Sequence, residues 1–241
     1  MGHPNIVEFA VYGDYGLFSD PITRVGGEKC SYQVPTYEAL KGVISSVYWK
    51  PTFIWYIDRV RVMNQIQTEV KGIRTLKYNG GGNDLSYYTY LKNCHYQVQA
   101  HFEWNYNRGE LENDRNENKH HNIAKRMIER GGRRDIFLGT RECQAYVEPC
   151  RFGEGNGAYD NLTELSFGLM YHGITYPDEA YSDETKDRMT ANFWNPVMKK
   201  GVIEFLRPEQ CLIHKPLHAM KMKSFEDKRN FVGIKEFEEV R

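Results

Sequence analysis

The sequence predicts an α+β protein: a ferredoxin-like (RRM-like) domain followed by a smaller C-terminal domain of antiparallel strands. Over residues 1–150, segments with strand and helix periodicity follow one another as β-α-β-β-α-β, the order of the ferredoxin-like fold and of RNA-recognition modules. After Cys150 the chain becomes glycine-rich and then shows short strand-like segments. A hydrophobic content of 40% in 241 residues allows a sizeable core and excludes a disordered chain.

The first half of the predicted domain contains a strand, a helix and a second strand. Val7, Phe9 and Val11 alternate with other residues over residues 5–13, which predicts a strand. Residues 36–48 carry apolar side chains at helical spacing, and the helix must stop before Pro51, which disfavours helical backbone at Lys50. Residues 53–63 are rich in aromatic and β-branched side chains and predict the second strand.

The second half follows a long insert, residues 64–91, that is interrupted by three consecutive glycines. Residues 93–104 predict a strand with one apolar face, and its other face presents His95, Gln97, Gln99, His101 and Glu103. Residues 118–130 predict a helix with Asn116 or Asn118 as N-cap and a glycine pair as its stop. Residues 136–138 and 143–147 offer the closing strand.

Beyond this domain, we expect a small β-rich domain over residues 151–213, with short strands near residues 165–171 and 202–206. Residues 214–241 read as a charged, weakly patterned tail. The N-terminus has no basic and apolar signal pattern, and no uninterrupted apolar stretch approaches membrane-spanning length. The five cysteines are scattered without a C-x-x-C pair, which favours reduced thiols in a cytoplasmic protein.

The predicted topology brings distant residues together. In this fold the strands take the order 4-1-3-2, and both helices lie antiparallel on one face of the sheet. The end of the first helix therefore lies beside the start of the second. Tyr48 ends the first helix, and Lys119 and His120 begin the second, so we expect these three residues to be neighbours.

The stretch NENKHHN, residues 116–122, admits three interpretations: a metal site, a metal-free acid–base site or a solvated helix end. Adjacent His120 and His121 diverge by about 100° on a helix and cannot chelate one ion. No H-E-x-x-H motif is present, and His95 and His101 stand too far apart along their strand to share an ion. We therefore predict no metal ligands in this chain.

The helical wheel turns His120 inward along the apolar face, with His121 at its edge and Lys119 to the side. Two interpretations stay open here: a core histidine satisfied by one hydrogen bond, or an acid–base group that faces a cleft near Tyr48. Histidine, lysine and tyrosine are also the groups that metal-free RNA cleavage requires. Histidine can move the proton, and lysine with the helix N-terminus can stabilise the developing negative charge.

The charge distribution indicates a polyanionic partner. The chain has a formal net charge of zero, yet between Arg115 and Arg141 eight Lys and Arg oppose three acidic residues, which predicts a phosphate-binding patch. A solvated helix face is the alternative explanation, and it suits Lys125 and Arg126 better than the GGRRD loop. The candidate RNA-binding residues are Lys50, Arg115, Arg126, Arg133, Arg134 and Arg141. Because the open face of residues 93–104 lacks stacking aromatics, we expect RNA to cross the helix end and the basic loops.

Several motifs resemble one family closely: DYGLFSDP, GGEKCSYQVPTYEALKG, SVYWKPTF, NQIQTEVKGIR, NENKH, GGRRDIFLGTREC and NPVMKKGVIEF. It is the CRISPR-associated repeat-cleaving endoribonuclease of type I-C (Dvulg subtype) systems, within the RAMP superfamily. The resemblance extends in order from about residue 7 to about residue 208. It assigns the catalytic tyrosine to Tyr48, and the catalytic lysine and histidine to Lys119 and His120. His121 lies outside the family pattern and receives no role.

The resemblance implies that residues 1–150 form the RNA-processing domain, without metal or other cofactor. Such proteins cut the repeat hairpin of precursor CRISPR RNA and leave a 5′-hydroxyl and a 2′,3′-cyclic phosphate. They then stay bound to the mature RNA with the other subunits of the type I-C interference complex. Duplex DNA is a further candidate partner. The alternative function is a non-catalytic subunit that caps the 5′ end of the CRISPR RNA, and a metal-dependent hydrolase is a third, weaker hypothesis.

Overall fold

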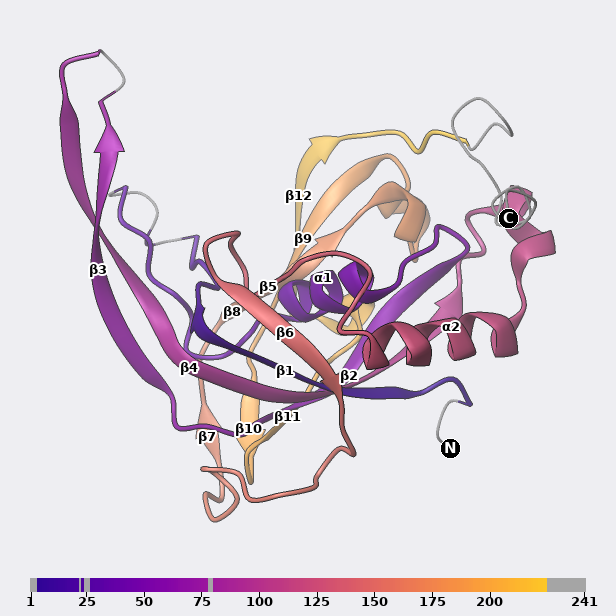
Figure 1. Ribbon diagram of the computed structural model, residues 1–241. Helices are drawn as coiled ribbons and strands as arrows, with labels where there is room; N and C mark the ends of the chain where they lie inside the picture. The colour runs from indigo at the N-terminus through magenta and orange to yellow at the C-terminus, as the bar shows by residue number, and fades with distance from the viewer. Residues whose placement is uncertain (1–3, 22, 24–26, 78–79, 225–241) are drawn as a thin grey trace, which may run out of the picture.

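The central part of the protein is an antiparallel sheet built from four strands, in a computed structural model that describes residues 4–21, 23, 27–77 and 80–224. These strands are β1 (Val7–Gly16), β2 (Phe53–Val62), β4 (Asn83–Trp104) and β6 (Gln144–Pro149). They pair in the order β6-β1-β4-β2 (Figure 1). In chain order these are strands 4-1-3-2 of the domain, so the α+β class and the ferredoxin-like order are confirmed.

Helices α1 (Tyr37–Val47) and α2 (Glu117–Glu129) form where the apolar spacing predicts them, and their buried side chains join the core of the sheet. The Thr36 side chain accepts a hydrogen bond from the Ala39 amide and caps α1. Asn116 caps α2 by accepting from the Lys119 amide at 3.1 Å. Gly131 and Gly132 end α2 with positive φ angles of 78° and 106°, which glycine adopts without steric cost.

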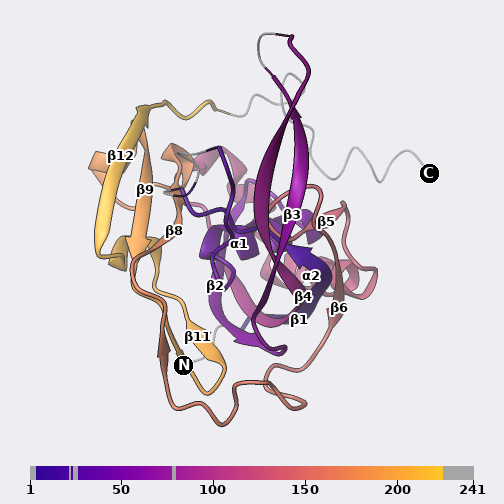
Figure 2. The same cartoon turned by 90° about the vertical axis from the view of Figure 1, so that its left-hand side faces the viewer.

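The insert over residues 64–91 is a β-hairpin. Strand β3 (Gln67–Leu76) pairs with the first half of β4, which begins at Asn83 rather than at residue 93. Figures 1 and 2 show this hairpin projecting from the body of the protein. Apolar residues such as Val70 and Leu76 are 61% and 87% exposed there. Tyr90 and Leu91 at the base of the hairpin join the core, but the outer part packs on no core, so its sequence carries no one-sided hydrophobic alternation that would reveal the strands.

The main sheet continues past β2 into strands from the C-terminal third of the chain. Strand β11 (Val202–Glu204) pairs with β2, and β10 (Val197–Lys199) and β7 (Leu165–Ser166) follow. At the opposite edge, β5 (Ile136–Phe137) pairs with β6. The main sheet therefore contains strands from both sides of residue 150, and the division of the chain at that residue stays a prediction.

A second, three-stranded sheet contains β12 (Ile213–Ala219), β9 (Arg188–Trp194) and β8 (Met170–Thr175). Residues 214–219 of the expected tail thus form a strand; its residues are exposed and lack a buried face that sequence patterning could signal. Residues 225–241 lie outside the described residues. Short 3₁₀ helices occupy the connections: η2 (Gly109–Asp114), η3 (Pro177–Glu179), η4 (Asp183–Thr185) and η5 (Pro208–Gln210).

The face of β4 opposite the helices is covered, against the expectation of an open polar face. Gln97 is only 5% exposed, because its side chain donates to the Glu154 carbonyl at 2.8 Å and accepts from the Gly153 amide at 2.9 Å. Arg61 binds the Asp160 carboxylate of the same segment at 2.8 Å. Residues 151–160 therefore lie across this face and satisfy its polar side chains.

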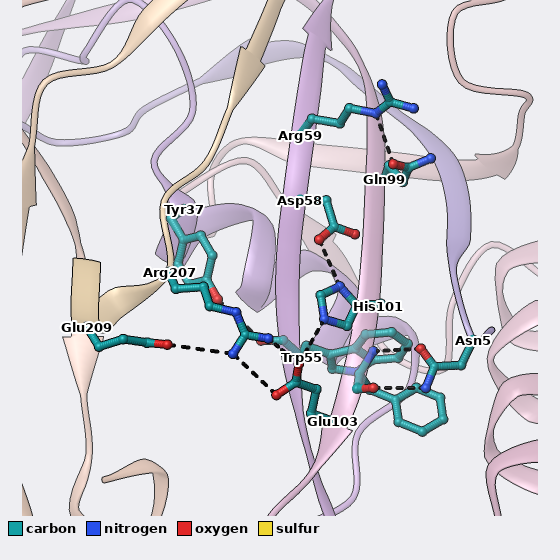
Figure 3. A network of polar contacts seen from close by, with 11 residues as sticks. Asn5, Tyr37, Trp55, Asp58, Arg59, Gln99, His101, Glu103, Arg207 and Glu209 are labelled. Atoms are coloured by element: carbon teal, nitrogen blue, oxygen red, sulfur yellow. Dashed lines mark hydrogen bonds and ion pairs between the residues drawn. The ribbon is translucent and has the colours of Figure 1, made fainter. Parts of the chain in front are cut away.

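A network of charged residues joins the C-terminal segment to the sheet (Figure 3). Arg207 forms an ion pair with Glu103 of β4, and its guanidinium lies 4.4 Å from the ring centre of Tyr56. His101 is 3% exposed and lies between Asp58 at 2.8 Å and Glu103 at 3.5 Å. These contacts fix the C-terminal segment against β2 and β4, which is the structural role we assign to His101.

Within the described chain, no helix combines the length and the apolar character needed to span a lipid bilayer. The five cysteines are all free thiols.

Candidate active site

Tyr48 lies at the C-terminal end of α1, where the chain leaves the helix. Its backbone is extended, with φ −157° and ψ 127°, as expected for a residue shortly before Pro51. The indole nitrogen of Trp55 donates a hydrogen bond to the Tyr48 carbonyl at 2.8 Å. The phenol is 3% exposed and faces the start of α2.

His120 lies in the first turn of α2, on its inward face, and is fully buried. Its ring is enclosed by aromatic side chains of the sheet: the ring centres of Phe53, Trp104 and Phe102 lie 5.3, 5.8 and 6.4 Å from it. The inward orientation predicted by the helical wheel is confirmed. Both ring nitrogens of this histidine therefore depend on protein partners for their hydrogen bonds.

Those partners determine the tautomer of His120. Nε2 lies 2.7 Å from the carbonyl oxygen of Asp114, which can only accept, so Nε2 carries the hydrogen and donates it. In the neutral ring, Nδ1 is then the acceptor. The Tyr48 hydroxyl lies 2.7 Å from Nδ1 and donates to it. The structure thus orders the pair: the tyrosine proton points toward the histidine.

Burial keeps both groups uncharged. It lowers the pKa of His120 below its ordinary value, although hydrogen bonding and negative charge from Asp114 act in the opposite direction. Burial also raises the pKa of Tyr48, and the Asp114 charge raises it further while Arg133 lowers it. At neutral pH the site therefore holds a neutral imidazole with a free lone pair directed at a neutral phenol.

Cationic side chains surround this pair. Lys119 lies 3.7 Å from the Asp114 carboxylate, and Lys50 is half-buried nearby. Burial lowers the pKa of Lys50; the Asp114 charge opposes this shift, and the positive charges of Arg133 and Lys119 add to it. The expected contact between Tyr48 and His120 is present, and Lys119 lies beside it through Asp114, which contacts both Lys119 and His120. The Asp114 carboxylate is a single negative charge that acts on both Lys119 and Lys50, so positive charge stays available to bind a phosphate.

Asp114 is the residue of this site that sequence reasoning missed. Its carboxylate accepts a hydrogen bond from the Thr52 hydroxyl at 2.7 Å and lies 3.5 Å from Nε2 of His120. The residue thus links the start of β2 to the start of α2. Its position six residues before His120 is a weak signal, since only the fold of η2 directs this carboxylate toward the site.

The candidate RNA-binding residues divide into exposed and structural ones. Arg126, Arg133, Arg134 and Arg141 are exposed. The Arg134 amide donates to the Ser46 carbonyl at 3.1 Å, which brings the GGRRD loop against α1.

Arg115 is instead half-buried, and its guanidinium donates to the carbonyls of Asn105 and Arg108 at 3.3 and 3.2 Å. The contacts of Arg115 thus stabilise the loop before α2.

His121 and the other histidines do not extend the site. Nε2 of His121 lies 3.0 Å from the Ile6 carbonyl, a contact that attaches α2 to the start of β1. His121 is thus half-buried rather than a solvated helix end. No group of three or more His, Cys, Asp or Glu side chains in the described part of the chain is arranged to hold a metal ion.

The fold and the site define a ferredoxin-like protein with a buried tyrosine–histidine pair beneath cationic side chains. Residues 6–206 match the family model described as CRISPR-associated protein (Cas_Cas5). The chain therefore belongs to the Cas5 family of CRISPR-associated proteins, and the resemblance noted from its motifs is confirmed at this level.

Three similar proteins illustrate the relationship. The structure of a CRISPR-associated protein is 35% identical with a TM-score of 0.73, and the alignment covers 87% of this chain and 96% of that one. A functionally uncharacterized protein from Streptococcus mutans is 38% identical with a TM-score of 0.71 and the same coverage. A CRISPR pre-crRNA endoribonuclease from Mannheimia succiniciproducens is 37% identical over 65 residues, which span 27% of this chain and 28% of the relative.

Proposed function

We propose that this protein is an endoribonuclease that cleaves the repeat stem-loop of precursor CRISPR RNA without a metal ion. The observation that carries the proposal is the 2.7 Å hydrogen bond between the Tyr48 hydroxyl and Nδ1 of His120, with Lys119 and Lys50 beside it. The Mannheimia relative, which matches this chain over 65 residues, is named a pre-crRNA endoribonuclease. Tyr48, Lys119 and His120 are the proposed catalytic residues.

The proposed reaction is an attack of the ribose 2′-oxygen on the adjacent phosphorus. The 2′-hydroxyl loses its proton, the bond to the 5′-oxygen breaks, and that oxygen gains a proton. The products are a 2′,3′-cyclic phosphate and a 5′-hydroxyl. Proton transfer by positioned side chains accelerates such steps by about 10² to 10⁴-fold.

Both ring nitrogens of the buried His120 have protein partners, so we assign it an indirect contact with RNA through Tyr48, which is 3% exposed. The Tyr48 oxygen accepts the 2′-hydroxyl proton while it passes its own proton to Nδ1 of His120. The Nε2–H bond to the Asp114 carbonyl keeps Nδ1 free as the acceptor. The raised pKa of Tyr48 makes a free phenolate unfavourable, which is why proton transfer to His120 must accompany the step.

The charge that develops on the phosphorane requires cations and N–H donors. Lys119 is part of the first turn of α2, where free amide groups and the helix dipole also favour an anion. In the structure without RNA, its ammonium group is 3.7 Å from Asp114 and 34% exposed, so it can turn toward a phosphate. We assign Lys119 to phosphorane stabilisation and to protonation of the leaving 5′-oxygen.

The exposed cations Arg126, Arg133, Arg134 and Arg141, together with Lys50, are the proposed contacts to the RNA backbone. Lys50 follows α1, and Arg126, Arg133 and Arg134 lie in the last turn of α2 and just after it, which suits a hairpin placed across the helix ends; Arg141 lies between β5 and β6. We further propose that the protein retains the mature RNA as a subunit of the type I-C interference complex. Duplex DNA stays a candidate partner of the same cations.

One observation favours a second candidate function. His120 is fully buried with both ring nitrogens hydrogen-bonded, as a structural histidine would be. The alternative is therefore a non-catalytic subunit that caps the 5′ end of the CRISPR RNA. In that case Tyr48 and His120 would serve only to hold α1 against α2.

Incubation of the protein with its repeat RNA in excess EDTA distinguishes these functions. The proposal predicts one cut at the base of the stem and products with a 5′-hydroxyl and a 2′,3′-cyclic phosphate. Intact but tightly bound RNA supports the capping subunit instead. Cleavage that stops in EDTA and returns with a divalent cation would support a metal-dependent hydrolase.

A further inference from the structure

A cavity of about 330 Å³ lies beside the proposed active site. It is enclosed by the last two turns of α1, the GGRRD loop after α2 and the segment that follows β8. Trp49 and Tyr176 contribute aromatic side chains to its lining, and Arg133 and Arg134 contribute cations. Trp49 follows Tyr48 in the chain, and the charge of Arg133, which also lines the cavity, acts on the Tyr48 phenol and lowers its pKa, so the cavity lies near the proposed active site.

Trp49 has the properties of a stacking surface. Its side chain is 48% exposed, although it is one of the largest apolar groups in the chain. In the described part of the protein its indole makes no hydrogen bond and no aromatic ring contact. Its backbone follows the Tyr48 carbonyl that Trp55 fixes at 2.8 Å, so the indole projects from a rigid part of the fold. An exposed aromatic ring on an anchored backbone is suited to stacking on a nucleobase.

The cavity is lined by charges of both signs: Arg133 and Arg134 on its exposed side, and Lys41, Glu38 and Glu179 in its covered part. Glu179 forms an ion pair with Lys41, and the Glu38 carboxylate accepts a hydrogen bond from the Ile174 amide at 3.1 Å. Lys41 is paired with Glu179, so the Glu38 carboxylate leaves the covered part with an excess of one negative charge. That charge repels a phosphate, and the exposed arginines attract it. The cavity therefore suits a ligand with an uncharged planar part and an anionic group that stays outside.

We propose that this cavity, the Trp49 pocket, binds one unpaired nucleotide of the RNA substrate next to the cleaved phosphate. The base stacks on Trp49, and the phosphate of the same nucleotide contacts Arg133 and Arg134. The identity of the ligand as RNA rests on the proposed function. The pocket itself follows from the aromatic lining, the charges and the position beside Tyr48.

Binding to an RNA that cannot be cut tests the pocket separately from catalysis. The probe is the repeat RNA with a 2′-deoxy sugar just 5′ of the scissile phosphate. We expect Trp49→Ala to bind it about tenfold more weakly than wild type, about 1.4 kcal/mol. Trp49→Phe should retain most of the affinity, because phenylalanine can still stack. Tyr146→Ala, which removes a 55% exposed aromatic side chain from β6, serves as the matched control and should bind like wild type.

Single abasic nucleotides placed in turn along the same RNA identify the stacked base. An abasic site at one position should lower the affinity of wild type about as much as Trp49→Ala does. The same abasic site should not lower the affinity of the Trp49→Ala variant any further.

The proposal is overturned if Trp49→Ala binds the uncleavable RNA within twofold of wild type. It is also overturned if every abasic position lowers the affinity of the variant as much as it lowers that of wild type. If wild type binds this RNA but does not cut the cleavable RNA, the proposed reaction is wrong. The comparison of wild-type and Trp49→Ala binding still tests whether the pocket holds a nucleotide.

Discussion

The Tyr48 hydroxyl donates a hydrogen bond of 2.7 Å to Nδ1 of His120, across a sequence separation of 72 residues. The two residues occupy the end of α1 and the start of α2, which the ferredoxin-like topology places side by side. The carbonyl of Asp114 holds the other ring nitrogen at 2.7 Å. This arrangement couples two ionisable side chains into one hydrogen-bonded unit.

Replacement of His120 by alanine should reduce cleavage of repeat RNA by at least about a hundredfold, because the proton acceptor behind Tyr48 is lost. RNA binding should be largely retained, since His120 is fully buried. Single-turnover cleavage in EDTA and equilibrium binding measure the two effects. His121→Ala is the matched control: it removes the neighbouring histidine and should leave the cleavage rate unchanged.

Tyr48→Phe should lower the cleavage rate by a similar factor. It also leaves Nδ1 of a buried histidine without its donor, which destabilises the fold by about 1–3 kcal/mol, so urea unfolding must accompany the kinetics. In a double-mutant cycle, the combined variant should be no slower than the slower single variant. Rate losses that multiply would mean that Tyr48 and His120 act independently, against the proposed relay.

A single 2′-deoxy sugar just 5′ of the scissile phosphate should prevent cleavage, because the attacking oxygen is missing. Affinity for the protein should stay within about twofold, since one hydroxyl contributes little to a large phosphate-dominated interface. Gel analysis of the modified repeat RNA, beside the same RNA with the deoxy sugar one nucleotide further along, measures this effect. Cleavage of the first RNA at the usual site would exclude attack by the 2′-oxygen.

The double variant Arg133→Ala/Arg134→Ala should weaken RNA binding and make it less dependent on salt. Each lost phosphate contact reduces the slope of log affinity against log salt by roughly one, so we expect a reduction of about one to two. Lys199→Ala/Lys200→Ala removes two exposed cations from the β10–β11 turn and is the control of equal charge. An equal slope in both variants would contradict a specific role for the GGRRD loop.

Stability should fall in acid partly through His172, which is fully buried and stacks on Tyr37 at 4.2 Å. Burial lowers its pKa from 6.5 to about 4. The unfolded chain therefore binds the proton more readily, and the stabilising contribution of the neutral ring is complete above pH 6.5 and is lost as the pH falls toward 4. The loss amounts to about 3 kcal/mol.

Urea unfolding of wild type and His172→Gln between pH 7 and 4 measures this contribution. The variant should be less stable at pH 7 but lose less stability on acidification. His218→Gln, at an exposed position of β12, should follow the wild-type curve. Parallel curves for wild type and His172→Gln would show that this histidine does not contribute to the acid sensitivity.

The strand order and the meeting of Tyr48, Lys119 and His120 could be predicted from sequence, because periodicity identifies the elements and topology fixes their neighbours. The helical wheel also oriented His120 correctly. Four features escaped prediction for physical reasons. The outer part of the β3–β4 hairpin and β12 have no buried face to impose alternation, and residues 151–160 cover β4 largely through backbone groups. The contacts of Asp114 depend on tertiary folding alone.

Among the RNA-binding candidates, Arg115 shows the same limit of sequence reasoning. Its charge suggested a phosphate contact, yet its guanidinium binds the carbonyls of Asn105 and Arg108. A count of charges cannot distinguish a cation directed at solvent from one that closes a loop. Arg133 and Arg134 differ because Gly131 and Gly132 end α2 immediately before them and leave their side chains exposed.

Strand β4 connects the periphery of the molecule to its centre, with one irregular residue, Asn93 at φ 53°, near its midpoint. It runs through 22 residues, from the projecting hairpin to Phe102 and Trp104 beside the His120 ring. An extended strand of this length spans roughly 70 Å. A single strand therefore supplies both one arm of the exposed hairpin and two of the aromatic side chains that enclose the buried histidine.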